Sequence, residues 1–222
     1  HNFKDFMGFP DLGRSDLRYP PSPPLPHPEL SPNKSIIDVI REKDIMLHYP
    51  YQSFHYIIDL LREASIDPLV RAIKMTFYRA AEGSSVMNAL INAARNGKQV
   101  TVFMELQARF DEEANIYWTN RLQEEGVKVI QTIPGFKVHS KLLQIRRKEN
   151  GENVYYANIS TGNFNESTAK VYADDSLLTG NQAITTEVNK VFHLFESKFI
   201  MPTFDNLIVA PFNIRDFFIR ML

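Results

Sequence analysis

Three strand segments that alternate with two helical segments are the feature of this sequence that most restricts its fold. The three apolar segments expected to form strands are 69–78, 99–106 and 127–132, and the two amphipathic segments expected to form helices between them are 84–96 and 112–125. Gly97 and Gly126 directly follow the two helical segments, where glycine commonly ends a helix. Strands and helices that alternate in this way predict an α/β fold with parallel strands and right-handed crossovers.

Further elements are expected on both sides of this unit. They are a strand over 44–48, a helix over 54–64 capped by Ser53, a hairpin of 141–147 and 153–160, a strand over 175–179 and a helix over 184–199. Asn150-Gly151 lies at the centre of the expected hairpin and is its strongest local signal. The sheet is therefore predicted to be mixed but largely parallel, with helices on both faces.

Three polar residues follow the three expected parallel strands at equal spacing. Arg79 comes directly after the first strand, Arg109 just after the second and His139 in the loop after the third, with 30 residues between neighbours. Ligands of open parallel sheets bind at the carboxyl ends of the strands. We therefore expect two guanidinium groups and one imidazole to converge on one edge. Guanidinium groups match phosphate oxygens, which points to phosphoryl or phosphodiester chemistry.

His139 and Lys141 form an H-x-K pair at the expected start of a strand. Residues i and i+2 of a strand face the same side, so the imidazole and the ammonium should project together. The imidazole can attack phosphorus while the ammonium stabilises the anionic oxygens. His139 is the candidate nucleophile, and Lys137 is a second candidate for contacting anions. The alternative is a solvated histidine beside a surface lysine.

Other polar residues near this pair leave more than one interpretation open. Asn165, in Gly162-Asn163-Phe164-Asn165, could orient the imidazole, donate to an oxyanion or cap a helix. Tyr172 could stack on a base, although its local sequence favours the core. Arg146–Lys148 flank the hairpin turn and are expected to face solvent. The acidic residues 111–113 are interpreted as the start of a helix, where carboxylates are favoured, rather than as metal ligands.

Composition limits the class of protein and its organisation. Eight of the thirteen prolines fall in the first 32 residues, which predicts an extended linker over 1–33 and a compact domain over 34–210, followed by 211–222 as the start of another segment. The net charge of −1 across 222 residues provides no general attraction for nucleic acid. The chain has no cysteine and no apolar run of membrane-spanning length, so a cytoplasmic location is expected. Both ends suggest a fragment of a longer protein.

The H-x-K pair with a downstream G-x-x-N resembles the phospholipase D superfamily. Arg146 stands five positions after the lysine, where that superfamily usually has an acidic residue, so ordinary phosphodiesterases are a poor match. Longer phrases are similar to the long-chain polyphosphate kinases that use a histidine intermediate. These phrases are residues 2–6, 47–51, 75–79, 105–112 and 161–165, and the resemblance extends over nearly the whole chain.

The resemblance implies roles for individual residues. His139 matches the histidine that becomes phosphorylated. Arg79 and Arg109 match positions of the magnesium–phosphate site, and since a guanidinium cannot ligate a cation, we interpret them as clamps on phosphates that carry Mg²⁺. Tyr172 matches a position in contact with nucleotide, which replaces the core interpretation.

The resemblance also implies a substrate class and an organisation. ATP or ADP and inorganic polyphosphate would be the substrates, without nucleic acid, and the full-length protein would form homo-oligomers with some association with membrane. The segment would contain the end of a middle domain and the first of two phospholipase D-like domains. We expect the segment alone to be inactive, because the second half of the site is absent. Two alternatives stay open: a phosphodiesterase or nuclease of the superfamily, and a non-catalytic module that binds polyanions.

Overall fold

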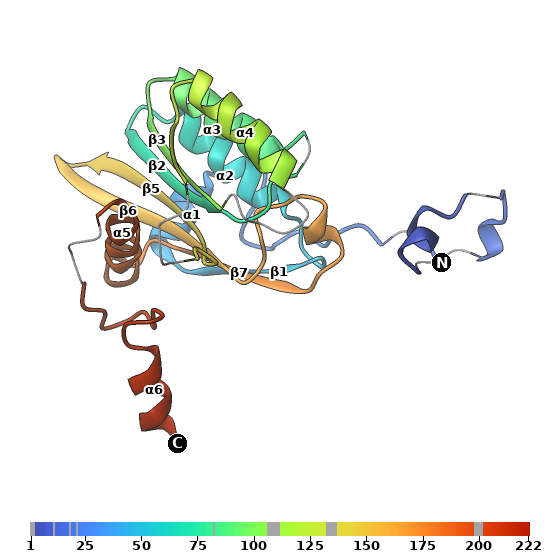
Figure 1. The fold of residues 1–222 in the computed structure, drawn as a ribbon. Helices are drawn as coiled ribbons and strands as arrows, with labels where there is room; N and C mark the ends of the chain where they lie inside the picture. The colour runs from blue at the N-terminus through green and yellow to red at the C-terminus, as the bar shows by residue number, and fades with distance from the viewer. Residues whose placement is uncertain are drawn as a thin grey trace.

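A seven-stranded mixed sheet forms the centre of the structure (Figure 1). The computed structural model describes residues 3–10, 12–17, 19–20, 22–81, 83–105, 112–131, 137–197 and 202–222. The strands are β1 Ile45–Tyr49, β2 Val70–Phe77, β3 Gln99–Met104, β4 Lys128–Gln131, β5 Lys141–Glu149, β6 Glu152–Ser160 and β7 Asp174–Thr179. Their order across the sheet is β1-β7-β6-β5-β2-β3-β4.

The three strands that alternate with helices form the parallel half of this sheet. β2 pairs with β3 and β3 with β4 in parallel, which confirms the prediction for these strands. The other four neighbouring pairs are antiparallel, so the expectation of a largely parallel sheet is wrong. The difference arises after β4, where the chain reverses and inserts β5 beside β2 instead of adding a fourth parallel strand.

Helices cover both faces of the sheet, as predicted (Figure 1). The α-helices are α1 Ile36–Glu42, α2 His55–Ile66, α3 Ser85–Arg95, α4 Glu112–Glu124, α5 Gln182–Glu196 and α6 Ile214–Met221, and the 3₁₀ helices are η1 Phe3–Gly8, η2 Ser15–Leu17 and η3 Thr168–Lys170. α2, α3 and α4 lie on one face and α5 lies on the other, whereas α6 and the N-terminal segment extend away from the sheet.

Two apolar cores fix the helices on the sheet. The larger core joins buried side chains of α1 to α4 to strand residues such as Ile73 and Met75. The smaller core packs Phe192 and Val188 of α5 against Phe103 of β3. Each large apolar side chain that is fully buried stabilises the fold by roughly 1.5–3 kcal/mol. These contacts hold β2 and β3 in place, and the candidate site is at their carboxyl ends.

The β5–β6 hairpin has the turn that its sequence predicts. Asn150 and Gly151 connect the two strands and have φ angles of 48° and 85°. Two successive positive φ angles are the backbone requirement of a type I′ turn, which Asn-Gly satisfies best. The turn fixes the register of β5, and hence the position of Lys141 at the other end of this strand.

The proline-rich segment makes contacts with the body near its end. The Leu25 amide donates to the carbonyl of Tyr51 at 2.7 Å, and the His27 amide donates to the Tyr56 hydroxyl at 2.8 Å. Leu30 is buried in the larger core. The domain boundary near residue 33 and the division at 210 stay predictions.

Within the described ranges, no helix combines the length and the apolar character needed to cross a membrane.

Candidate active site

The antiparallel insertion of β5 brings the H-x-K loop to the end of β2. Leu143 of β5 pairs with Met75 of β2, so the start of β5 lies beside the carboxyl end of β2. Lys141 is the first residue of β5, and His139 stands in the loop just before it. β5, whose antiparallel pairing was not predicted, therefore places His139 at the carboxyl end of β2, the edge where the sequence predicts the site.

The Thr76 hydroxyl fastens this loop to β2. It donates to the Ser140 carbonyl at 2.7 Å and accepts from the Leu142 amide at 2.9 Å. Thr76 is almost fully buried, so water does not compete with these two hydrogen bonds. The backbone on both sides of Lys141 is thus held directly by the parallel half of the sheet.

His139 and Lys141 project together, which confirms the geometric part of the prediction. The Lys141 ammonium nitrogen lies 3.2 Å from Nδ1 and 3.3 Å from Nε2 of His139, and it also donates to the His139 carbonyl. Lys141 is only 7% exposed, whereas His139 is exposed. An accessible imidazole thus lies beside a buried, immobilised cation, which is the arrangement expected of a nucleophile and an anion-stabilising group.

Tyr78 occupies the centre of this group of side chains. Its ring meets the His139 imidazole edge-on, with 4.9 Å between ring centroids. The ammonium nitrogens of Lys137 and Lys141 lie 5.4 and 5.7 Å from the centroid of the same ring. Both distances permit cation–π attraction. The Tyr78 ring therefore positions both candidate cations and the imidazole on one surface.

The electrostatics of the site favour a neutral imidazole. Partial burial of the ring lowers the pKa of His139, and the positive charges of Lys141 and Lys137 lower it further. Burial also lowers the pKa of Lys141, while the carboxylate of Asp174 opposes that shift. A neutral imidazole has the free nitrogen lone pair that nucleophilic attack requires.

The loop that contains Asn165 borders the same edge. Lys141 pairs with Ser160 in the sheet, and this loop follows Ser160 directly. Phe164 is buried and packs on Phe77 at the end of β2, with 6.1 Å between ring centroids. The Asn165 side-chain oxygen accepts from the amides of Ser167 and Thr168, both at 3.0 Å. Asn165 is thus a cap for the turn that leads into η3, and a catalytic role for it stays a prediction.

Gly162 stands where a Cβ atom would collide with a neighbouring side chain. A Cβ atom there would lie 2.4 Å from a carboxylate oxygen of Asp174. The same carboxylate accepts from the Thr161 hydroxyl at 2.8 Å. The glycine therefore allows close approach of Asp174, the acid that opposes the pKa shift of Lys141, rather than of a ligand.

The other predicted site residues are placed less completely. Arg79 directly follows Tyr78 and so has its backbone at the same edge. Arg109 lies outside the described residues, and its convergence with His139 stays a prediction. Tyr172 follows η3 and is 63% exposed, which excludes the core interpretation of its local sequence.

Asn115 of α4 holds the backbone around Arg79. Its side-chain nitrogen donates to the carbonyls of Tyr78 at 3.1 Å and Glu105 at 2.9 Å, and its side-chain oxygen accepts from the Ala80 amide at 3.3 Å. Asn115 is fully buried. One side chain thus joins the carboxyl ends of β2 and β3.

We expect Asn115→Leu to lower the free energy of unfolding by about 3 kcal/mol or more. The substitution keeps the branching of the side chain at Cγ but leaves three buried backbone groups unpaired, each of which costs roughly 1–3 kcal/mol. Urea denaturation, followed by fluorescence of Trp118, measures the change. Asn120→Leu, at an exposed position of the same helix, is the control and should change stability by less than about 0.5 kcal/mol. Equal effects of the two substitutions would contradict the role of Asn115.

Sequence reasoning missed Tyr78, Thr76 and Asn115. Thr76 and Tyr78 lie two positions apart in the expected strand over 69–78, so its alternation already placed them on one face. Asn115 had no such signal, because its role depends on contacts between α4 and the ends of two strands. For metal binding, no three His, Asp or Glu side chains in the described ranges lie close enough to hold an ion.

Comparisons with known proteins identify the family of this chain. The family model for polyphosphate kinase C-terminal domain 1 matches residues 35–200. Polyphosphate kinase of Escherichia coli K12 is 51% identical over the whole chain, and that of Yersinia pestis is 52% identical over 97% of it. The matches cover 33% and 31% of these relatives, so the chain spans about a third of their length.

Solved structures support both the family and the fold. The crystal structure of polyphosphate kinase from Porphyromonas gingivalis superposes on 99% of this chain with a TM-score of 0.87 and 37% identity, and the match covers 37% of that protein. Nuc of Salmonella typhimurium, a phospholipase D family member, has the same fold over 68% of this chain and 91% of its own, with a TM-score of 0.53 and 14% identity. The predicted phospholipase D-like fold is confirmed, and the chain belongs to the polyphosphate kinase C-terminal domain 1 family.

Proposed function

We propose that the complete protein containing this chain transfers the γ-phosphate of ATP reversibly to inorganic polyphosphate through a phosphohistidine. The observation that carries the proposal is the accessible His139 ring with the buried Lys141 ammonium 3.2 Å from its nitrogen. The relatives of this chain, named polyphosphate kinase, support ATP and polyphosphate as the substrates. The chain spans only a third of those relatives, so the activity is proposed for the complete protein.

The reaction proceeds in two displacements. In the first, a neutral nitrogen of His139 attacks the γ-phosphorus in line, the P–N bond forms, and the P–O bond to ADP breaks with its electron pair on the ADP oxygen. In the second, a terminal oxygen of polyphosphate attacks the same phosphorus, and the P–N electron pair returns to the imidazole. Excess ADP reverses both displacements.

The chain's own charges stabilise the transferred group. Lys141 and Lys137 neutralise oxygens that gain charge as the phosphoryl group moves, and Arg79 and Arg109 clamp the phosphates of ATP. Mg²⁺ would be supplied with the nucleotide as MgATP, and it would neutralise charge on the phosphates that Arg79 and Arg109 clamp. Tyr172 is exposed and contacts the nucleotide. Asn165 orients the loop beside the imidazole.

Phospholipase D-like sites combine two related halves, and this chain supplies one of them. We therefore propose that the chain has little activity by itself. Homo-oligomerisation and peripheral membrane association also stay predictions for the complete protein.

The proposed function is tested with the complete protein, MgATP and a polyphosphate primer. The expected result is elongation of the primer with one ADP released for each phosphate added. Turnover of bis(p-nitrophenyl) phosphate without ATP would indicate a phosphodiesterase instead. Binding of polyphosphate with neither reaction would indicate a non-catalytic module.

Lys137→Gln should move the acid limb of the phosphorylation rate to higher pH. The wild-type rate should fall only below the ordinary imidazole pKa of about 6.5, because burial and the two lysines lower the pKa of His139. Removing one positive charge favours the imidazolium, so the pKa rises and more of the ring is protonated at a given pH. The measurement is the single-turnover rate of protein phosphorylation between pH 5 and 8, and Lys34→Gln, at an exposed position, is the control. An unchanged limb would contradict the electrostatic coupling.

A further inference from the structure

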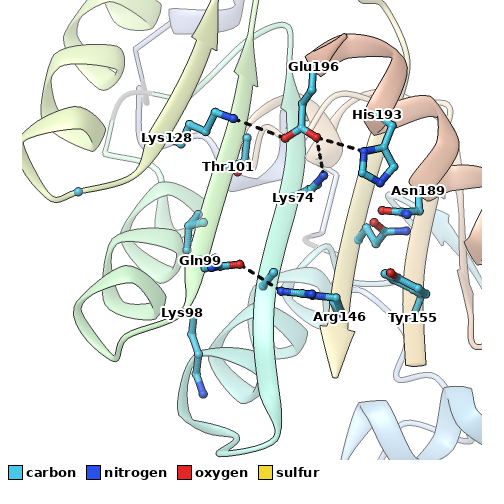
Figure 2. A pocket seen from close by; sticks show the side chains of 14 residues that line it. Lys74, Lys98, Gln99, Thr101, Lys128, Arg146, Tyr155, Asn189, His193 and Glu196 are labelled. Atoms are coloured by element: carbon cyan, nitrogen blue, oxygen red, sulfur yellow. Dashed lines mark hydrogen bonds and ion pairs between the residues drawn. The ribbon is translucent and has the colours of Figure 1, made fainter. Parts of the chain in front are cut away.

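A second polar site lies on the face of the sheet that carries α5 (Figure 2). It is a pocket of about 590 Å³ between β2, β3, β4 and β5 on one side and α5 on the other. Side chains of Lys74, Gln99, Lys128, Arg146 and Glu196 line it. Neither His139 nor its neighbours Tyr78 and Lys141 contribute to this lining.

Cations dominate the lining of this pocket. Lys74, Lys128 and Arg146 contribute three positive charges, against the single carboxylate of Glu196, whereas the ammonium of Lys98 is turned to the Asp67 carbonyl (Figure 2). The whole chain, in contrast, has a net charge of −1. Arg146 is half-buried, lines the pocket and donates to the Gln99 side-chain oxygen at 3.1 Å. The expectation of a solvated face is wrong for its neighbour Arg147, whose side chain is 15% exposed and lies 2.7 Å from the Asp67 carboxylate. This concentration of positive charge attracts anions locally.

Glu196 acts as an internal anion at one end of the pocket. Its carboxylate lies 3.0 Å from the Lys74 nitrogen, 3.7 Å from the Lys128 nitrogen and 3.5 Å from Nδ1 of His193 (Figure 2). Lys128 is 63% exposed and can reach other anions. Arg146, near the turn end of β5, donates to the neutral side-chain amide of Gln99 in the pocket. A polyanion can therefore compete with one carboxylate for several cations.

We propose that this pocket binds an anion made of linked phosphates, and that it holds a remote part of the polyphosphate chain. The identification of the ligand as polyphosphate rests on the proposed function. Lys74 and Thr76 point to the same face of β2, and Tyr78 follows two residues later. Four residues of strand separate Lys74 from Tyr78 by roughly 13 Å. Thr76, Phe103 and Leu142 lie between the two sites and are buried beneath α5, so a long polyphosphate that ends at His139 would reach the pocket around the edge of the sheet.

Lysine acetylation of the complete protein, mapped by mass spectrometry, tests the proposal with tripolyphosphate as the probe. At about ten times its Kd, the probe leaves roughly a tenth of the sites free, so acetylation of Lys128 should slow about tenfold. Lys34 is exposed, remote from the pocket lining, and should react at an unchanged rate. Sodium sulfate of equal ionic strength is the control for general screening of charge by salt, and it should leave the acetylation rate of Lys128 nearly unchanged. The same measurement with ATP in place of tripolyphosphate shows whether the pocket prefers inorganic chains to the phosphates of a nucleotide.

Two substitutions in the pocket should act in opposite directions. Arg146→Gln should weaken binding of tripolyphosphate about tenfold, since a charge-assisted hydrogen bond is lost. Glu196→Gln should strengthen it severalfold, since the competing carboxylate is removed. A merely structural role would make both substitutions act in the same direction.

The test also separates this proposal from the proposed function. Protection of Lys128 should persist in His139→Ala, which removes the candidate nucleophile. Kinase activity without protection would overturn the pocket proposal alone, and protection without kinase activity would overturn the proposed function alone. Protection by ATP only, equal protection by sulfate, or a Lys128 that is unreactive before any ligand is added would each overturn the pocket proposal.

Discussion

His139→Ala is expected to lower the kinase turnover of the complete protein by about 10⁴-fold or more. The substitution removes the atom that forms the covalent bond, and loss of a nucleophile costs several orders of magnitude in enzymes that use covalent catalysis. The measurement is steady-state synthesis of polyphosphate from ATP, together with the reverse synthesis of ATP from ADP and polyphosphate. Both directions should fail, because both pass through the same intermediate.

His55→Ala is the matched control for this experiment. His55 is exposed at the start of α2, and β1, the strand that precedes it, is separated from β5 by β7 and β6 in the sheet. Its removal should change turnover by less than about twofold. Retention of more than a hundredth of the activity in His139→Ala would contradict the covalent route.

Lys141→Gln is expected to lower kcat by roughly 10²–10³-fold. The ammonium is fixed by burial beside the imidazole, and a preorganised charge of this kind stabilises the oxygens that become more negative during transfer. The effect should fall on kcat more than on KM, since the charge develops in the transition state. Steady-state kinetics with varied MgATP measure the two parameters separately.

Lys148→Gln, on the same strand as Lys141, is the control for charge removal. Lys148 is exposed near the β5–β6 turn, at the end of β5 that is remote from His139. The control should leave both kinetic parameters within about twofold of their original values. A Lys141→Gln variant with a raised KM and an unchanged kcat would show that Lys141 only binds substrate.

Local patterns predicted the elements of the fold better than their arrangement. The parallel strands β2 to β4 follow from apolar segments that alternate with helices, and the β5–β6 turn follows from Asn150-Gly151. The position of β5 beside β2 depends on contacts between residues about 70 apart, such as Met75 and Leu143, and no local pattern encodes it. Helix α1 was missed although Ser35 caps it, because seven residues carry too little periodicity.

The candidate site was predictable where its chemistry lies within a few residues. The H-x-K spacing alone placed the imidazole and the ammonium together, because two-residue alternation is a property of the strand itself. The contribution of Tyr78 depends on a loop some 60 residues later in the chain, and that of Asp174 on the close approach that Gly162 allows. Arg147 was misjudged because residues beside a hairpin turn usually face solvent, whereas this one is 15% exposed and pairs with the Asp67 carboxylate.

The most direct test of the phosphohistidine is to trap it in the complete protein. The protein is incubated with MgATP labelled in the γ-phosphate, quenched in alkali and digested, and the labelled peptide is sequenced by mass spectrometry. The account predicts a label on His139 that is stable in alkali, is lost in acid, and is discharged to ATP by ADP. Label that persists in His139→Ala, or rapid turnover with no protein-bound phosphate at any time, would contradict it.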